Sequence, residues 1–89
     1  MAKRRLTLVN KYGLHARACA KLLATAGQFE SRITVCKGEQ QAPAQSLTRL
    51  LMLAAGPGTE LDVHAEGRDA DEALSALEAL IENRFGESE

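Results

Sequence analysis

The residues best suited to chemistry lie in the segment KYGLHARACAK, residues 11–21, where His15 is followed two positions later by Arg17. A glycine precedes the pair and an alanine-rich stretch follows it, so we expect a loop to turn into a helix near Ala16. His15 then lies at or beside the N-cap, where the first amides have no intrahelical partner and the macrodipole adds roughly half a positive charge. Such a position binds phosphate and disfavours a protonated imidazole, so we expect a neutral histidine.

A neutral imidazole, open amides and a nearby guanidinium together suit a histidine that accepts a phosphoryl group and passes it on. The forked donors of Arg17 match phosphoryl oxygens, and the amides of Ala16 and Arg17 add further donors. On this interpretation, His15 is the nucleophile and Arg17 stabilises the phosphoryl group. On the residues alone, the alternative is helix capping and surface charge, because a histidine and an arginine at a helix start often do no more than that.

Three other residues are weaker candidates for chemistry. Cys19 lies four positions after His15, on the same side of the expected helix, and could form a Cys–His dyad or half of a metal site. No further ligand lies nearby in the sequence, so we prefer a small buried residue and expect no metal or organic cofactor. His64 should point to the open face of a sheet without a role, and Ser46 should cap a second helix.

Three segments alternate apolar and polar residues with the period of a half-buried strand: RLTLVN, SRITV and ELDVHAE. The turn KGEQ follows the second segment. Pro43 limits residues 40–44 to a sheet edge or to no strand, because proline cannot donate to a sheet ladder. The inward-facing residues are expected to be Leu6, Leu8, Ile33, Val35, Leu61, Val63 and Ala65.

Three other segments place apolar residues on one side of a helix. The first stripe is Ala16, Cys19, Ala20, Leu23 and Ala26; the second is Leu47, Leu50, Leu51 and Ala54; the third is Ala70, Ala73, Leu74, Leu77, Leu80 and Ile81. GPG ends the second helix, and Asp69 with Glu72 resembles a capping box that opens the third. With Met52 and Leu53, the second stripe covers too much of the circumference to be buried, so part of it should form an exposed apolar patch.

The order of these elements is βαββαβα, which predicts an α+β fold. Because every strand has one polar face, the four-stranded antiparallel sheet should carry all three helices on one side and face water on the other. A chain of 89 residues is expected to form one domain, residues 1–89. Its core should be aliphatic and alanine-rich, since only 3% of the residues are aromatic.

Charge and composition disfavour several classes of protein. Residues 1–49 hold nine Lys/Arg and two Asp/Glu, and residues 50–89 hold two Lys/Arg and ten Asp/Glu, so a net charge of −1 combines a basic and an acidic half. The stretch AKRR suggests a small RNA-binding domain, but the acidic half and the scarcity of aromatic residues disfavour it. No apolar run approaches the ~20 residues that cross a bilayer, and no leader is recognisable. We expect a cytoplasmic protein with reduced thiols at Cys19 and Cys36 and no membrane or nucleic-acid partner.

The sequence resembles the HPr family of phosphocarrier proteins, which belong to the bacterial phosphoenolpyruvate-dependent phosphotransferase system. GLHAR matches the family's active-site histidine motif. QSLTRLLML matches the segment of its second helix that begins with a regulatory serine position, and AEGRDADEAL matches the stretch that leads into its last helix. These motifs occur in register over nearly the whole chain, which implies the HPr-like open-faced β-sandwich. Ala18, Gln45 and Pro43 depart from the family pattern, which commonly has proline, lysine and a polar residue at these positions.

The resemblance also implies roles for particular residues. It implies that His15 carries the phosphoryl group on Nδ1 with the help of Arg17, and that Ser46 is a candidate for regulatory phosphorylation. The residues expected to contact partner proteins are Lys21, Leu47, Arg49 and Leu51.

In function, the resemblance implies a phosphocarrier and not an enzyme with its own turnover. Phosphoenolpyruvate-dependent enzyme I would phosphorylate His15, and the group would pass to a histidine of an enzyme IIA-type protein. A serine kinase/phosphorylase is a further candidate partner, and we expect a monomer. The transfer could serve sugar uptake or the nitrogen-related regulatory branch called NPr. The alternative is a non-phosphorylated regulatory protein-binding module that acts through the patch on the second helix.

Overall fold

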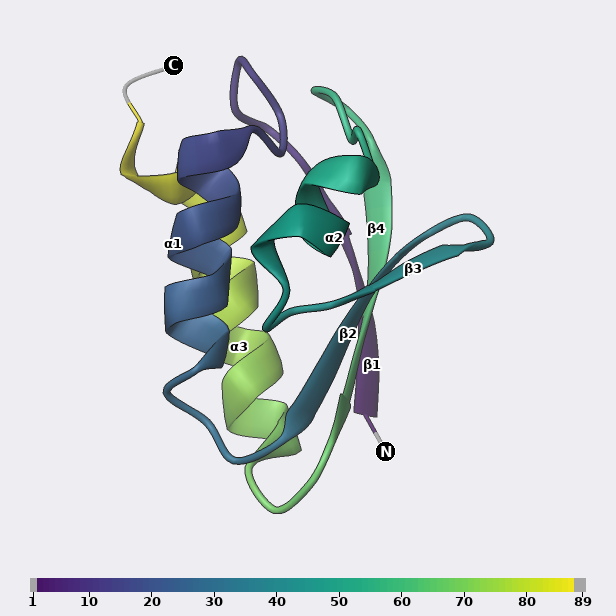
Figure 1. The fold of residues 1–89 in the computed structure, drawn as a ribbon. Helices are drawn as coiled ribbons and strands as arrows, with labels where there is room; N and C mark the ends of the chain where they lie inside the picture. Colours follow the sequence, from purple (N-terminus) through teal and green to yellow (C-terminus); the bar gives the residue numbers. More distant parts are fainter. Residues whose placement is uncertain (1, 88–89) are drawn as a thin grey trace.

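The computed structural model describes residues 2–87 and contains four strands and three α-helices in the predicted βαββαβα order (Figure 1). In chain order the elements are β1 (Ala2–Thr7), α1 (Ala16–Ala26), β2 (Arg32–Lys37), β3 (Gln40–Pro43), α2 (Leu47–Met52), β4 (Glu60–Glu66), α3 (Ala70–Glu82) and the short 3-10 turn η1 (Arg84–Gly86). The sequence patterns do not predict η1, which proves important for the site.

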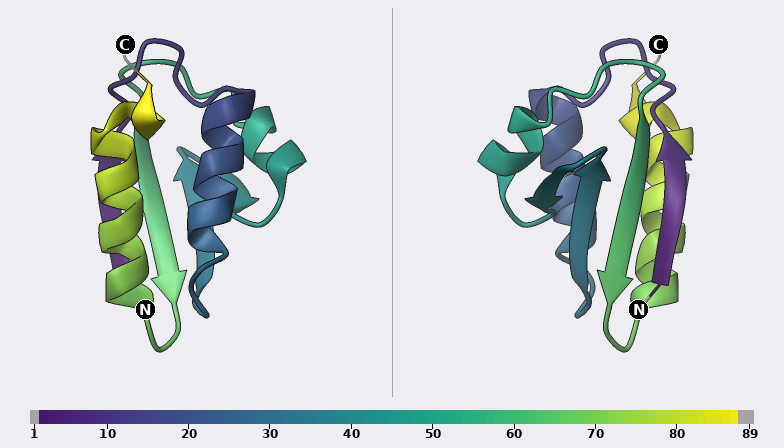
Figure 2. Two further views of the ribbon diagram at one scale, coloured as in Figure 1. Left: turned by 90° about the vertical axis from the view of Figure 1, so that its left-hand side faces the viewer. Right: turned by 90° about the vertical axis from the view of Figure 1, so that its right-hand side faces the viewer.

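The four strands form one antiparallel sheet in the order β1-β4-β2-β3 (Figure 2). β4, the last strand in the sequence, lies between β1 and β2 and pairs with both. β3 lies at an edge and pairs with β2, where Pro43 is opposite Thr34. The edge position predicted for Pro43 is confirmed. Proline is tolerated there because an edge strand needs ladder hydrogen bonds on one side only.

One face of the sheet carries the three helices and the other is open, as the alternating strands predict (Figures 1 and 2). α3 packs on β1 and β4, whereas α2 packs on β3 and on α1. His64 is half-buried on the open face, opposite Lys3 and Thr34. The predicted inward-facing residues are all buried, namely Leu6, Leu8, Ile33, Val35, Leu61, Val63 and Ala65.

The core is aliphatic and alanine-rich, in agreement with the low aromatic content. Small side chains let the helices approach the sheet closely. One aromatic residue, Phe85 of η1, is fully buried among the aliphatic side chains of the core. The alanines with no exposed surface are Ala18, Ala26, Ala42, Ala44, Ala65 and Ala73. Among the helices of residues 2–87, none has the length and apolar character needed to cross a membrane.

The buried side of α1 is rotated relative to the predicted stripe. Ala16 and Ala20 are exposed, and Leu23 is only partly buried. The buried residues are Ala18, Cys19, Leu22 and Ala26. The prediction was wrong because alanine is too small to mark which side of a helix faces the core, and packing against the sheet and its neighbours decides it. The rotation leaves Ala16 at the surface, beside His15.

The stripe predicted on α2 is only partly buried, as its excess of apolar residues predicts. Only Leu50 within the helix is buried, and Leu53 follows it into the core. The residues left exposed are Leu47, Leu51, Met52 and Ala54. The predicted exposed apolar patch is therefore present, and we use the name α2 patch for Leu47, Leu51 and Met52.

Asp69 is the N-cap residue of α3, but it does not form the predicted capping box, since its side chain makes no cap hydrogen bond. Its carboxylate instead accepts hydrogen bonds from the amides of Glu30 and Ser31, at 2.8 and 2.9 Å, and from the Ser31 hydroxyl at 2.5 Å. These bonds, the hydroxyl first, hold the pKa of the Asp69 carboxyl below its ordinary value. Asp69 thus ties the loop after α1 to the start of α3.

Candidate functional site

His15 is the N-cap residue of α1, with extended backbone angles of φ −91° and ψ −176°. Two residues earlier, Gly13 has a left-handed φ of +64°, and a Cβ there would lie 2.5 Å from the carbonyl oxygen of Ala55. The amide of Leu14 donates a hydrogen bond to that same oxygen at 2.8 Å. Glycine is therefore required for the loop to pack against Ala55 before the helix begins, and this packing sets the position of His15.

The N-terminus of α1 is open to an anion. Within residues 2–87 no side chain caps it, and its first turn holds no acidic residue. The amides of Ala16 and Arg17 have no intrahelical acceptors, as at any helix start. Arg17 is exposed in this turn and adds a permanent positive charge to that of the helix macrodipole. Both features favour binding of a phosphoryl group.

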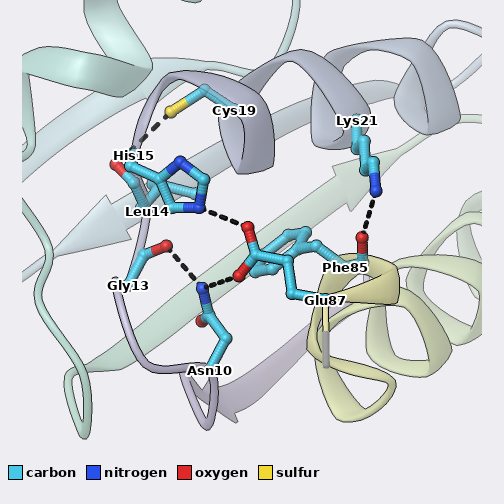
Figure 3. Close-up of polar contacts among 8 residues, drawn as sticks. All are labelled: Asn10, Gly13, Leu14, His15, Cys19, Lys21, Phe85 and Glu87. Carbon is cyan, nitrogen blue, oxygen red and sulfur yellow. Dashed lines mark hydrogen bonds and ion pairs between the residues drawn. The ribbon is translucent and has the colours of Figure 1, made fainter. Parts of the chain in front are cut away.

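Glu87, from the far end of the chain, holds the His15 side chain (Figure 3). Nε2 of His15 is hydrogen bonded to Oε2 of Glu87, while Nδ1 points away from the carboxylate. Oε1 of Glu87 accepts a hydrogen bond from Nδ2 of Asn10 at 3.0 Å, and the same nitrogen donates to the Gly13 carbonyl at 2.8 Å. The side chains of His15 and Glu87 are 30% and 12% exposed, so their contact is partly shielded from water.

The Glu87 carboxylate is negative at neutral pH. The hydrogen bond from Asn10, together with the hydrogen bond and charge of His15 and the charge of Arg17, holds its pKa below the ordinary 4.5 against the opposing effect of partial burial. A carboxylate beside Nε2 favours a proton on that nitrogen. The prediction of a neutral histidine considered only the helix amides, and the structure adds an anion on the other side of the ring.

Glu87 reaches His15 because η1 turns the chain back over the start of α1. Its three residues all have positive φ, of 54°, 55° and 78°, a conformation that costs a non-glycine residue about 1–2 kcal/mol. Two contacts offset this cost. Phe85 is fully buried, and its carbonyl accepts a hydrogen bond from Nζ of Lys21 at 2.5 Å. Strain that the surrounding structure maintains is typical of functional sites.

These groups surround an open pocket of about 680 Å³. Its lining residues are Tyr12, His15, Ala16, Arg17, Lys21, Gly86 and Glu87. Tyr12 is 63% exposed and stands edge-on to the imidazole, with ring centroids 5.9 Å apart and an interplanar angle of 87°. The pocket has room for a phosphoryl group and for the end of the side chain that delivers it.

Cys19 does not pair with His15. Its thiol is fully buried and donates a weak hydrogen bond to the Leu14 carbonyl at 3.6 Å. Burial raises the pKa of the Cys19 thiol to about 11, so it stays protonated at neutral pH. Across the part of the chain that the structure describes, no group of three or more His, Cys, Asp or Glu side chains could hold a metal ion.

α2 forms a second region of interest next to α1. Ser46 caps it as predicted, since its Oγ accepts a hydrogen bond from the amide of Arg49 at 3.2 Å. Leu47 and Leu51 are 40% and 39% exposed. The Arg49 guanidinium donates to the carbonyl of Gln41 at 3.1 Å, which directs it toward β3. The residues predicted to contact partners thus divide between α2 and, for Lys21, the pocket.

The structure brings together four predicted residues around one pocket, namely His15, Ala16, Arg17 and Lys21. It adds Asn10 and Glu87, which the sequence patterns do not identify. The only sequence signal is the segment RFGE, which contains Glu87. A phenylalanine and a glycine beyond the last helical stripe indicate that the chain packs back on the core. That signal indicates neither the direction of the turn nor its contact with His15.

Comparison with known proteins agrees with the fold and identifies the family. The family described as "PTS HPr component phosphorylation site" matches residues 2–83. The phosphocarrier protein HPr of Cupriavidus necator is 47% identical over 89 residues, which is 100% of both chains. The phosphocarrier protein NPr of Shewanella violacea is 44% identical over 86 residues, covering 97% of this chain and 94% of the relative. The crystal structure of HPr-C-His from Thermoanaerobacter tengcongensis has a TM-score of 0.95 at 38% identity, with 100% of each chain covered.

These similarities extend over nearly the whole chain, and both the family description and the relatives concern phosphate carriage. Such proteins carry a phosphoryl group and are not catalysts with their own turnover. The HAR triplet, the βαββαβα fold with its open sheet face, and the relatives lead to one assignment. The chain belongs to the HPr family of phosphocarrier proteins of the phosphotransferase system.

Proposed function

We propose that the chain accepts a phosphoryl group on Nδ1 of His15 from phosphoenolpyruvate-dependent enzyme I and passes it to a histidine of an enzyme IIA-type protein. The observation that carries the proposal is the geometry of His15. Glu87 occupies Nε2, whereas Nδ1 points away from that carboxylate at the open N-terminus of α1. Residues 1–89 act as one cytoplasmic domain, and the partners supply most of the catalytic power by aligning donor and acceptor.

The proposed transfer is an in-line displacement at phosphorus. The lone pair of Nδ1 forms the new N–P bond while the bond from phosphorus to the donor atom breaks, and the electron pair of that bond leaves with the donor. Nε2 keeps its proton, so the phosphorylated ring carries a positive charge. On this proposal, the amides of Ala16 and Arg17 and the Arg17 guanidinium hold the phosphoryl oxygens. The same displacement by the acceptor histidine returns His15 to its starting state.

Partner proteins dock, on this proposal, over the pocket and the exposed side of α2. Leu47 and Leu51 supply apolar contact, and Lys21 and Arg49 supply positive charge that suits an acidic partner. The exposure of Leu47, Arg49 and Leu51 on α2, which packs beside α1, supports this role. Lys21 also belongs to the fold, because its Nζ donates to the Phe85 carbonyl.

Ser46 is the proposed regulatory site, in addition to its role as a helix cap. Its Oγ lies at the start of α2 next to Leu47. Phosphorylation there by a serine kinase would add negative charge beside the docking surface and weaken binding of an acidic partner. Relatives carry both HPr and NPr names. The proposed transfer serves sugar uptake or nitrogen-related regulation, depending on which enzyme IIA-type protein accepts the phosphoryl group.

The proposal is tested by incubation with phosphoenolpyruvate, Mg²⁺ and enzyme I, followed by intact mass spectrometry. We expect one acid-labile phosphoryl adduct on the wild-type chain and none on His15→Ala. Equal labelling of His15→Ala would contradict the site. Absence of any adduct, under conditions that label a known HPr, would favour the non-phosphorylated binding module instead.

A further inference from the structure

We infer that Glu87 is a positioning residue for phosphoryl transfer: together with Asn10 it keeps the proton of His15 on Nε2, so that the lone pair of Nδ1 is free to attack phosphorus. This inference rests on the proposed function of His15 and adds to it a residue 72 positions away in the sequence. Neither Asn10 nor Glu87 belongs to the GLHAR motif.

Asn10 fixes the direction of the hydrogen bonds. Its Nδ2 faces two acceptors, the Gly13 carbonyl at 2.8 Å and Oε1 of Glu87 at 3.0 Å. A flipped amide would set Oδ1 against both acceptors, so the neighbours determine its orientation. A carboxylate can only accept, so Oε2 of Glu87 requires a donor, and the N–H at Nε2 of His15 is that donor. Hydrogen bonds of fixed direction therefore link the Gly13 carbonyl, Asn10, Glu87 and the imidazole, with Asn10 donating to both of its neighbours and Glu87 accepting from both of its own (Figure 3).

The burial of Asn10 supports a specific role for its amide. Asn10 is 1% exposed, and within residues 2–87 its Oδ1 is buried without a hydrogen-bond partner. An unsatisfied buried oxygen destabilises a fold, and an apolar residue at the same place would avoid that cost. The amide offsets this cost with two hydrogen bonds from Nδ2, one to the loop before His15 and one to Glu87.

The carboxylate is positioned independently of His15. Phe85, two residues before Glu87, is fully buried, and Lys21 holds its carbonyl at 2.5 Å. The positive φ angles of η1 direct the chain that follows toward the start of α1. Glu87 is therefore in place before a phosphoryl group arrives, which is the requirement for a preorganised site.

The same carboxylate suits the product of the step. When Nδ1 forms the N–P bond and the electron pair of the broken bond leaves with the donor, the ring gains one positive charge and Nε2 keeps its proton. The negative Glu87 side chain, 12% exposed, already faces that proton. No proton has to move during the transfer, and the new charge is balanced at once.

Glu87→Gln gives a sharp test, because a carboxamide has one acceptor and one donor. Asn10 is a fixed donor, so the Gln oxygen should turn toward Asn10 and the Gln NH₂ toward Nε2 of His15. Nε2 must then accept, which moves the ring proton to Nδ1 and blocks the nucleophile. Glu87→Ala, by contrast, removes the hydrogen bond to Nε2 and imposes no position on the ring proton. If Glu87 merely contributed negative charge or packing, Gln would be the milder of the two changes.

The tautomer is read from long-range ¹H–¹⁵N spectra of the imidazole at about pH 8, where an ordinary histidine is neutral. We expect the Nε2–H form in the wild type, a mixture in Glu87→Ala, and the Nδ1–H form in Glu87→Gln. Single-turnover phosphorylation by enzyme I should slow about threefold in Glu87→Ala and about tenfold or more in Glu87→Gln, as expected for the loss and the reversal of one hydrogen bond. Glu82→Gln, which removes an exposed charge near the same end of α3, is the matched control and should behave as wild type.

Two results would overturn the inference. One is a wild-type ring spectrum in Glu87→Gln, and the other is phosphorylation of Glu87→Gln at or above the rate of Glu87→Ala. Failure of the proposed function is distinguishable from both, because it would appear as equal labelling of His15→Ala or as no labelling of the wild type. The spectra also report on the folded protein without any partner, so they decide the tautomer even if enzyme I binds a variant poorly.

Discussion

At the scale of single residues, His15 lies between two opposing influences. The amides at the start of α1 and the cation of Arg17 place positive charge beside the ring, whereas the Glu87 carboxylate places negative charge at Nε2. A phosphate carrier needs both, because its ring is an uncharged nucleophile before the transfer and is positively charged after it. The separation of the two influences, with the carboxylate at Nε2 and Nδ1 pointing away from it, suits this change of charge.

Arg17→Ala should slow phosphorylation of His15 without abolishing it, because the helix amides still bind the phosphoryl oxygens. Loss of one charge-assisted contact of ~1.5–3 kcal/mol corresponds to a rate roughly ten- to a hundredfold lower. Single-turnover transfer from enzyme I is the measurement. Arg68→Ala, which removes an exposed cation from the loop before α3, should transfer at the wild-type rate. A wild-type rate for Arg17→Ala as well would reduce Arg17 to a solvated charge.

Cys19 should resist alkylation in the folded protein. Its thiol is fully buried with a pKa raised to about 11, so at about pH 8 the reactive thiolate is scarce. Iodoacetamide followed by peptide mass spectrometry should modify Cys19 only after denaturant unfolds the chain. Cys36, which is 7% exposed, provides an internal comparison. Rapid modification of Cys19 in the folded state would contradict this prediction and would support a Cys–His dyad instead.

At the scale of elements, the site depends on how loops deliver side chains to the start of α1. The loop before α1 packs on Ala55 through Gly13, and η1 folds back through Phe85. Both connections contain left-handed backbone, which glycine permits at Gly13 and which tertiary contacts maintain at Arg84 and Phe85. The position of His15 relative to Glu87 is therefore a property of two loops and not of the helix alone.

Gly13→Ala should destabilise the protein more than Gly38→Ala. Both glycines have a left-handed φ, of +64° and +59°, which costs alanine about 1 kcal/mol. At Gly38 the new Cβ meets nothing within 4 Å, but at Gly13 it meets backbone of Ala55 at 2.5 Å, which should add about 1–3 kcal/mol. Denaturant unfolding measures the difference. Equal losses would mean that the loop can shift without cost, and then His15 should phosphorylate normally in Gly13→Ala.

Leu47→Glu should weaken binding of enzyme I while leaving thermal stability nearly unchanged, because Leu47 is 40% exposed in the α2 patch. The new carboxylate opposes an acidic partner and imitates the sign of a phosphorylated Ser46. The measurements are the half-saturating concentration of enzyme I and the melting temperature. Leu50→Ala is the contrasting variant, since this fully buried leucine should cost about 2–5 kcal/mol without changing docking of the folded protein. A large fall in melting temperature with normal affinity in Leu47→Glu would remove Leu47 from the docking surface.

At the scale of the whole molecule, the basic and acidic halves of the sequence interleave. β4, from the acidic half, lies between β1 and β2 from the basic half. Arg5 contacts Asp62 of β4 at 3.0 Å, and Arg4 contacts Glu78 of α3 at 2.7 Å. Cations of the basic half therefore pair with carboxylates of the acidic half. These pairs are partly exposed and contribute little stability, but they reduce the charge separation that the sequence suggests.

Asp69 links distant parts of the molecule, and Asp69→Asn should lower the melting temperature in a pH-dependent way. The pKa of Asp69 lies below its ordinary 3.8, first because of the Ser31 hydroxyl and then the Glu30 amide. The carboxylate therefore stabilises the fold fully above the unfolded pKa, and this contribution is lost as the pH falls through the folded pKa. We expect the difference in melting temperature from wild type to be largest near neutral pH and to shrink below about pH 4.

The matched control for this measurement is Asp71→Asn, which changes an exposed carboxylate in the first turn of the same helix. It should show a smaller effect, because it leaves the contact with the loop after α1 intact. A difference from wild type that stays constant over the whole pH range would contradict the role of the Asp69 carboxylate.

The sequence by itself determined the order of the strands and α-helices, the two faces of the sheet and the place of the HAR triplet at the start of α1. Alternation in a strand and motifs such as GLHAR are local patterns, and local sterics and solvation decide them. Where a local pattern was ambiguous, it did not identify the buried residues. The stripe predicted on the alanine-rich α1 was wrong, and on the leucine-rich α2 the pattern predicted an exposed patch without deciding which leucine is buried. There the neighbouring elements selected Leu22 and Leu50 for burial.

Only the tertiary structure decided which group faces each ring nitrogen of His15. The contact with Glu87 joins residues 72 positions apart, and the bonds of Asp69 to Ser31 span 38. Such contacts depend on the path of the backbone through η1 and around the sheet, for which residue spacing carries no information. A carboxylate beyond the last helix looks like an ordinary surface charge in the sequence. It becomes part of the site because burial of Phe85 turns the chain back toward α1.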